Sequence, residues 1–249
     1  MDITTENITT EIKNNIASIK LPDSFKLISI NRYVFPDEHP INTHLDEGMF
    51  VLQNGKQKIG LFQFGVKRIN ARGQNITKYN APPTITLDFV QGIKQKSSSV
   101  KFPKGWQEAI VNTFIMACVP VIEKNPEIKI RYREFIPERS GISNYQEIMK
   151  RVRDLENECK ALERSTDPEL RKLINIKQEK LQREISLMRF ITAIRDRYFD
   201  KEGYLNPKRE RVNSIFKTYA ENKKLAVLKL KKMKQKQKAI RERRKVKIK

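Results

Sequence analysis

The sequence predicts an α+β fold: an N-terminal mixed, β-rich domain with one main buried helix, then an antiparallel, coiled-coil-like helical hairpin and a long basic C-terminal helix. Three observations predict it. Alternating and β-branched apolar residues dominate the first half of the chain, an apolar repeat of four and three residues begins near Asn144, and lysines crowd the C-terminal end. These changes divide the chain into the segments 1–138, 139–202 and 203–249.

The composition favours one moderate core with helical extensions. The chain has 249 residues, of which 38% are hydrophobic and 32% charged. Its two cysteines, Cys118 and Cys159, are too few for a disulfide framework or a four-cysteine zinc site. The N-terminus lacks the basic and apolar regions of a signal peptide, and no run of 18 apolar residues occurs. We therefore expect an intracellular protein of a reducing compartment (cytoplasm, nucleoid or virion), neither secreted nor in a membrane.

The N-terminal segment begins with a helix and continues with strands. Isoleucines at helical spacing predict an amphipathic helix over 3–19 that ends before Pro22. Apolar and β-branched residues then predict a strand over 25–35. Two further strands within 49–66 flank the dipeptide Asn54-Gly55, which accepts the positive φ angles of a tight turn, so they form a β-hairpin.

The rest of this segment predicts two strands and the main buried helix. A polar loop or β-arm over 68–83 precedes a strand over 84–90. The buried helix spans 106–119 and ends at Pro120 or a little beyond it, and a last strand covers 127–136. Alternation divides each strand between a buried and a solvated face. The inward residues are Ile85, Leu87, Phe89, Ile128, Ile130 and Tyr132, and the outward ones are Thr84, Thr86, Asp88, Lys129, Arg131 and Arg133.

From Asn144 onward the apolar residues follow a coiled-coil seam that runs through three helices. Ser143 and Gln146 form a capping box at the first helix, and Asp167-Pro168 start the second, which runs to about residue 199. Gly203 ends this antiparallel hairpin, and Asn206-Pro207 start the third helix. The seam residues are Ile148, Val152, Leu155, Cys159 and Leu162, then Leu170, Ile174, Leu181, Ile185, Met188 and Ile191, then Val212, Phe216, Tyr219, Ala226, Leu230, Met233 and Ile240.

The third helix carries most of the positive charge of the chain. From Pro207 onward there are eighteen lysines and arginines against three acids, a net +15 of the formal +22. Charge concentrated in this way repels itself unless a polyanion neutralises it, and nucleic acid is the commonest large polyanion. The candidate nucleic-acid-binding residues are Lys223, Lys224, Lys229, Lys231, Lys232, Lys234, Lys236, Lys238, Arg241, Arg243, Arg244, Lys245, Lys247 and Lys249.

The residue types in this helix favour phosphate contacts over base readout. Lysine is a flexible point charge, and after Tyr219 the chain has no aromatic residue on which a base could stack. We therefore expect sequence-independent binding to the phosphate backbone of DNA or RNA, as a structural or accessory component of a nucleoprotein assembly. The main alternative is a structural subunit of a virion or scaffold, whose basic helix docks on acidic protein. Two further alternatives are that this segment is a disordered tail or a helix that lies on a membrane surface.

A second candidate nucleic-acid surface combines the predicted loop with the last strand. It consists of Lys67, Arg68, Arg72, Lys78, Lys129, Arg131 and Arg133, with Tyr79 as a stacking residue. If the two groups of cations lie together, they form a groove for a phosphate backbone. The alternative is that they are ordinary charges on a solvated face.

Signatures of catalysis and of cofactor binding are weak, so we expect no enzyme, no cofactor and no metal. The chain has two histidines, in a proline-containing loop that fixes no ligand geometry, and it lacks a P-loop, a nucleophile elbow and an HExxH motif. Asp88, Glu127 and Lys129 keep a metal-dependent nuclease as an alternative, because paired carboxylates hold Mg²⁺ and a lysine polarises water. The apolar seam and charged outer faces of the hairpin predict protein partners or a second copy of the chain.

Overall fold

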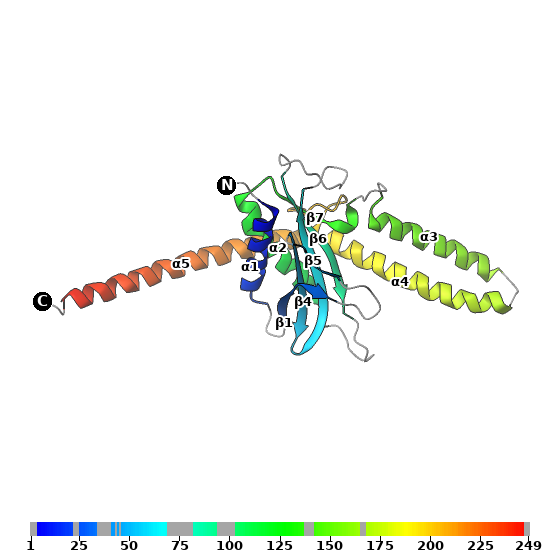
Figure 1. The fold of residues 1–249 in the computed structure, drawn as a ribbon, viewed down its shortest axis with the longest axis horizontal. Helices are drawn as coiled ribbons and strands as arrows, with labels where there is room; N and C mark the ends of the chain where they lie inside the picture. Colours follow the sequence, from blue (N-terminus) through cyan, green and yellow to red (C-terminus); the bar gives the residue numbers. More distant parts are fainter. Residues whose placement is uncertain are drawn as a thin grey trace.

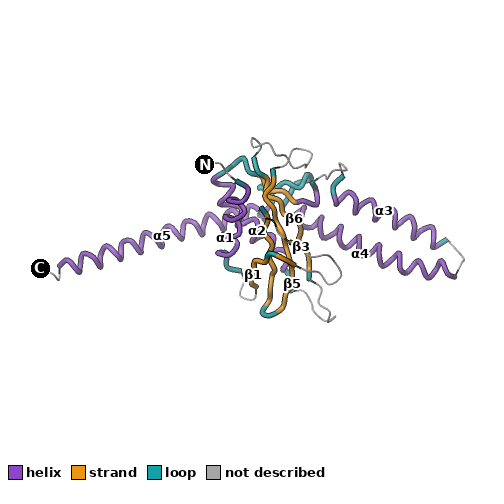
Figure 2. The backbone as a smooth tube through the Cα atoms, in the orientation of Figure 1, coloured by secondary structure: helices purple, strands orange, loops and turns teal. Residues whose placement is uncertain are grey.

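A computed structural model describes residues 4–21, 25–33, 41–42, 44, 46–68, 82–93, 103–136, 142–164 and 168–246. The predicted α+β class is confirmed: a sheet with helices on one face forms a central body, and two helical projections leave this body on opposite sides (Figure 1). Figure 2 shows that one projection is the helical hairpin and that the other is a single C-terminal helix.

The main sheet has five strands in the order β1-β4-β5-β6-β7, and a separate two-stranded sheet pairs β2 with β3. The first four strands of the main sheet are antiparallel neighbours, whereas β7 lies parallel to β6 after a crossover through α2. The strands are β1 (Phe25–Ile30), β2 (Arg32–Tyr33), β3 (Ile41–Asn42), β4 (Glu47–Asn54), β5 (Gln57–Lys67), β6 (Thr84–Gly92) and β7 (Lys129–Tyr132).

The predicted hairpin joins β4 to β5. Its two loop residues are Gly55 and Lys56, because Asn54 already pairs with Gln57. Gly55 has φ +58, so a glycine stands at the first loop position, where a type II′ turn requires it. This local prediction is therefore confirmed, with the turn one residue later than the Asn-Gly dipeptide.

A β-bulge in β6 corrects the predicted faces of that strand. Gln63 pairs with Phe89 and the next residue, Phe64, pairs with Leu87, so Asp88 is an extra residue in the ladder. The bulge shifts the alternation: Ile85 and Leu87 face the main core, but Phe89 packs with the small apolar cluster on the other side. The prediction that Phe89 points inward is wrong for this reason.

The face of β6 that was predicted to be solvated is in fact covered. Thr84, Thr86 and Asp88 are all buried, and the Asp88 side chain is only 1% exposed. Thr86 and Asp88 satisfy part of each other's hydrogen-bonding capacity, because the Thr86 hydroxyl donates to Asp88 Oδ1 at 2.7 Å. The alternation of apolar and polar residues along β6 therefore predicted a solvated face where the structure has a buried one.

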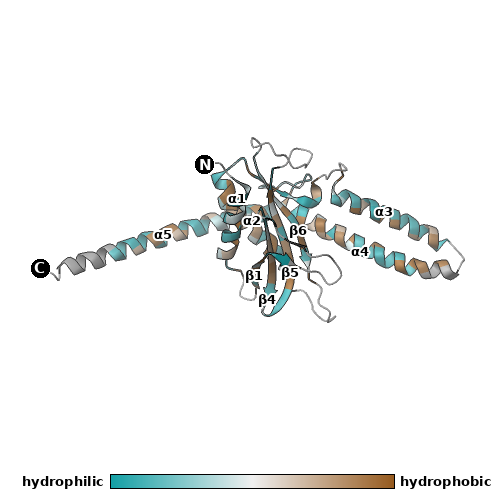
Figure 3. Ribbon diagram, in the orientation of Figure 1, coloured by the Kyte–Doolittle hydropathy of each residue, from teal (hydrophilic) through white to brown (hydrophobic). Residues whose placement is uncertain are grey.

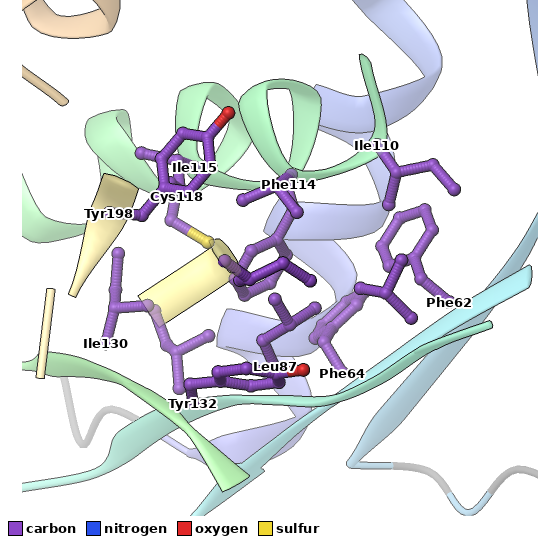
Figure 4. Packing of buried hydrophobic residues seen from close by; sticks show 14 of the residues in the cluster. Phe62, Phe64, Leu87, Ile110, Phe114, Ile115, Cys118, Ile130, Tyr132 and Tyr198 are labelled. Carbon is purple, nitrogen blue, oxygen red and sulfur yellow. The ribbon is translucent and has the colours of Figure 1, made fainter. Parts of the chain in front are cut away.

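The main core lies between the sheet and two helices, α1 (Thr5–Ser18) and α2 (Trp106–Lys124). Figure 4 shows Phe62 and Phe64 of the sheet beneath Phe114 of α2, with ring centroids 6.3 and 5.7 Å from the Phe114 ring. Helix α1 adds the buried isoleucines of its predicted apolar face. Helix α2 continues through Pro120 and ends four residues later.

The hairpin consists of α3 (Asn144–Glu163) and α4 (Pro168–Tyr198). Ser143 and Gln146 form the predicted capping box, with both reciprocal hydrogen bonds present. Among the described side chains, two salt bridges join the helices, Arg151 to Glu184 at 3.3 Å and Lys177 to Glu158 at 2.7 Å. At the base of the hairpin, α4 enters the body, where Ile191, Ile194 and Tyr198 belong to the main core.

The chain after α4 returns to the free edge of β7. Tyr132 N donates to Gly203 O at 2.8 Å and Leu205 N donates to Ile130 O at 2.9 Å, so residues 203–205 act as a short extra strand. Arg131 was predicted to face solvent. This prediction is wrong, because the returning segment covers its side chain, which stacks on the Tyr204 ring at 4.5 Å.

Helix α5 (Glu210–Val246) starts three residues later than the predicted Pro207, which lies in a turn. Val212 and Ile215 are buried in the main core, where α5 contacts α2. The helix then continues without a break to Val246 as one of the two projections. Among the described residues, no helix combines the length and the apolar character needed to cross a membrane.

Candidate nucleic-acid interface

The base of α5 is fixed to the body by apolar packing and, among the described residues, by two ion pairs with α2, of which one joins Arg211 to Glu108 at 3.6 Å. Val212 is fully buried and Ile215 is 6% exposed. One helical turn beyond Tyr219, the Lys223 ammonium lies 2.7 Å from the Glu123 carboxylate of α2 and 5.8 Å from the centre of the Tyr219 ring. The hydrogen bond and the charge of Glu123 raise the pKa of Lys223. The direction of the projecting helix is therefore set by its contacts with α2.

Beyond Lys223 the side chains of α5 are exposed as far as Gln237. Six lysines lie in this part, and the sequence holds no acid between Glu221 and Glu242. None of the six has an ion pair or hydrogen bond with another described residue. They are Lys224, Lys229, Lys231, Lys232, Lys234 and Lys236.

Helical geometry gathers these lysines into rows. Lys229, Lys232 and Lys236 follow the i, i+3, i+7 spacing of one row, and Lys231 and Lys234 belong to a second row. From Glu221 to Val246 the helix extends about 39 Å at its usual rise per residue. This length is close to one turn of B-form DNA, which is about 34–36 Å. The projection thus offers an extended array of positive charge.

The remaining predicted cations of the C-terminal segment lie beyond the described side chains. The backbone is helical to Val246, so the helical prediction for this part is confirmed. The side chains of Lys238, Arg241, Arg243, Arg244 and Lys245 are outside the described residues, as are Lys247 and Lys249 entirely.

Apolar residues also occur along the projecting part of α5, where the ribbon in Figure 3 turns brown. Each of them is about half exposed and none belongs to a described core cluster. They are Leu225, Val227, Leu228, Leu230 and Met233. Leu230 and Met233 continue the helix face that Val212 and Ile215 bury in the body. This surface is the feature that favours a protein partner for the same helix.

The described cations of the second predicted surface divide between two sets of neighbours. Lys67 is 3.5 Å from Glu47 and 3.9 Å from Asp88, so two carboxylates already oppose its charge. Arg131 is buried, and the Lys129 ammonium lies 5.3 Å above the Tyr204 ring.

The other members of this surface are only partly described. Arg133 lines a pocket with Asp88. Arg68 is partly buried, and Arg72, Lys78 and Tyr79 lie outside the described residues. The structure therefore brings Lys67 and Arg133 towards Asp88, and places Lys129 and Arg131 beside Tyr204 instead.

Asp88 belongs to a buried polar cluster with Glu47 and Lys67, which the sequence analysis missed. Burial raises the pKa of Asp88, while the Lys67 charge and the Thr86 hydrogen bond oppose this rise. The Glu47 carboxylate accepts from the Gln63 amide at 2.9 Å. Strands β4, β5 and β6 supply the three charges, and their separation in sequence leaves no local motif that could have revealed them.

The three residues of the nuclease alternative are not assembled. Lys129 lies opposite Thr84 in the parallel β6–β7 ladder, four positions before Asp88. At about 3.3 Å per strand residue, this offset corresponds to about 13 Å along the sheet. Within the described ranges, no group of three or more His, Cys, Asp or Glu side chains could hold a metal ion. His44 is exposed, and His39 lies outside those ranges.

Comparison of the chain with protein-family models, with curated proteins and with solved structures gave no match. Only the charges, exposure and contacts of the residues themselves therefore indicate what this protein binds. Among these, the exposed lysines of α5 form the most strongly charged surface, and they were found from sequence because charge composition needs no tertiary contact to be recognised.

Proposed function

We propose that this protein binds nucleic acid through its phosphate backbone, without catalysis and without reading base sequence, along the projecting part of α5. One observation carries the proposal: six exposed lysines lie on an anchored helix, with no acid among them and no ion pair to any described residue. A polyanion would neutralise these charges and release its own counterions, which is favourable at low salt.

The chemistry of the surface supports phosphate contact in preference to base contact. Lysine ammonium groups make undirected contacts with phosphate oxygens, whereas base recognition relies on the planar fork of arginine or on amide side chains. Leu225 and Met233 offer apolar contacts but no ring for stacking. The proposal therefore includes both DNA and RNA as ligands.

In this proposal the body holds the basic helix at one end and the hairpin at the other. Helices α3 and α4 leave the body on the side opposite to α5 (Figure 1). The hairpin is then free to bind a protein partner or a second copy while α5 contacts nucleic acid, as in an accessory or structural component of a nucleoprotein assembly. Cys118 and Cys159 are buried free thiols, which suits an intracellular, reducing compartment.

A second candidate function is that of a subunit in a large protein assembly, with α5 docked on an acidic protein. The half-exposed Leu225, Leu228 and Met233 favour this alternative, because phosphate binding gives no role to apolar side chains. An acidic groove with an apolar floor would cover these residues and pair with the lysines at the same time.

The salt dependence of binding tests the proposed function. For a duplex, the slope of log affinity against log salt should be on the order of −5 to −8, and native and scrambled sequences should bind within a few-fold of each other. Replacing Lys231, Lys232, Lys234 and Lys236 by glutamine should make the slope shallower by about 2 to 4.

The matched control removes the same number of charges elsewhere. Lys20, Lys26, Lys56 and Lys180 are exposed and lie outside α5, so their replacement by glutamine should leave the slope nearly unchanged. A shallow slope in the wild type, or displacement of the nucleic acid by a stoichiometric acidic protein, would replace the proposal by the assembly-subunit function.

A further inference from the structure

A second cationic site lies where the hairpin joins the body. A pocket of about 650 Å³ opens between β7, the short 3₁₀ helix η1 (Arg133–Phe135), the start of α3, and the end of α4 with the turn that follows it. Five cationic residues line it, and one carboxylate accompanies them. These charged residues are Arg131, Lys150, Arg153, Arg195, Lys201 and Glu202.

Arg131 is the residue that distinguishes this pocket from an ordinary charged surface. Its side chain is buried, with 4% of the residue exposed, and it has no carboxylate partner among the described residues. Arg131 Nε donates to Glu202 O at 3.1 Å and Nη2 approaches Phe135 O at 3.5 Å, but the buried Nη1 has no hydrogen-bond partner. An unpaired, buried charged donor is unfavourable unless an anion completes it.

The other cations surround this buried guanidinium from separate elements. Lys150 and Arg153 come from α3, and Lys201 from the turn after α4; all three are exposed and form no ion pair with described residues. The Arg195 guanidinium lies 5.4 Å from the Phe135 ring centre and 5.6 Å from that of Tyr145, and the Asp196 carboxylate already opposes its charge at 2.8 Å. Tertiary packing therefore brings charged residues from three elements together in one pocket.

We propose that this pocket binds a phosphate group, carried by a free nucleotide or by the end of a nucleic-acid strand. The guanidinium of Arg131, which lines the pocket and has no carboxylate partner among the described residues, supplies a charge-assisted hydrogen bond to one phosphate oxygen. Lys150, Arg153 and Lys201 balance the remaining negative charge from the solvent side. Because α5 projects from the opposite side of the body, this site is separate from the proposed nucleic-acid interface (Figure 1).

Titration calorimetry of the full chain with pyrophosphate tests this proposal. A salt concentration of about 0.15 M is used because it largely screens weak attraction between exposed charges. The wild type should show saturable binding. Replacing both Arg153 and Lys201 by glutamine should weaken it about tenfold or more. Both side chains are exposed, so the variant should fold, and its melting temperature verifies this. The control pair is Lys160→Gln with Lys180→Gln, also exposed and outside the pocket.

The outcomes separate this site from the α5 interface. The variant with glutamine in place of Lys231, Lys232, Lys234 and Lys236 should bind pyrophosphate as tightly as the wild type, whatever the effect of these substitutions on duplex binding. Absence of saturable binding in the wild type, or equal affinity in the Arg153/Lys201 double variant, would overturn the proposed pocket. Loss of binding in the α5 variant alone would overturn it too, because it would assign the phosphate to the projecting helix.

Two further ligands identify the source of the phosphate. A nucleoside diphosphate that binds in a pocket-dependent manner indicates a free nucleotide. An oligonucleotide with a 5′-phosphate that binds more tightly than its 5′-hydroxyl form, and loses this gain in the double variant, indicates a strand end.

Discussion

The ammonium of Lys223 lies 2.7 Å from the carboxylate of Glu123, and this ion pair joins α5 to the C-terminal turn of α2 at the point where α5 leaves the body. Both side chains are about half exposed, so the pair adds little to stability. Its effect is on charge: Lys223 is already opposed by a carboxylate, whereas the six described lysines that follow it have no carboxylate partner among the described residues.

Lys223 should therefore contribute less to nucleic-acid binding than a lysine farther along the helix. Lys231→Gln removes a charge with no carboxylate partner and should make the salt slope shallower by about 0.9 if that charge contacts phosphate. Lys223→Gln should change the slope much less. Filter-binding titrations at several salt concentrations check this, and equal effects of the two substitutions would contradict it.

Two truncations should separate folding from binding. A chain that ends at Asn222 keeps the packed base of α5, so it should melt close to the wild type while losing most nucleic-acid affinity. A chain that ends at Arg209 also loses the buried Val212 and Ile215, so its melting temperature should fall markedly. Thermal unfolding and gel-shift titration measure the two effects. If the chain that ends at Asn222 bound nucleic acid as tightly as the wild type, the binding site would have to lie on another surface.

Substitution of apolar residues on α5 should lower the free energy of unfolding by different amounts, according to their position. Ile215→Ala removes side-chain contacts in the main core and should lower the free energy of unfolding by about 2–5 kcal/mol. Leu228→Ala changes a half-exposed side chain and should cost less than about 0.5 kcal/mol. Urea unfolding of both variants provides the comparison. A large cost at Leu228 would show that the isolated chain already covers this face, for example by self-association.

Asp88 should make stability depend on pH in an unusual direction. Burial raises its pKa in the folded state, so the folded protein binds this proton more tightly than the unfolded chain does. The contribution of Asp88 to the free energy of unfolding therefore falls as pH rises from about 3.9 to the raised pKa, and stays low above it. Each pH unit in that window changes the contribution by at most about 1.4 kcal/mol.

The comparison that isolates this effect is between wild type and Asp88→Asn. Between pH 7 and pH 4.5 the wild type should gain stability relative to the variant, as measured by urea unfolding at both values. Asp154→Asn, on the exposed face of α3, should show no such relative change. A wild type that loses stability relative to Asp88→Asn on acidification would show that the Lys67 attraction dominates over burial.

Elements with local signals could be predicted from the residues alone. The β4–β5 turn was recognisable because Gly55 tolerates a positive φ, and the start of α3 because Ser143 and Gln146 satisfy backbone groups within one helical turn. The basic character of α5 needed only composition. Such features depend on residues a few positions apart, so their physics is visible in a short window. The division into segments at residues 138 and 202 stays a prediction.

Features that join distant segments depend on how the folded chain packs. The bulge at Asp88 arises from pairing with β5, and it moved Phe89 to the other face of the sheet. Arg131 became buried because Glu202, which is 71 residues away, accepts its hydrogen bond after the chain returns to the edge of β7. Alternation describes one strand in isolation; whether a face is solvated depends on what packs against it. Contacts between segments so far apart are set by packing of the whole chain, which no local pattern encodes.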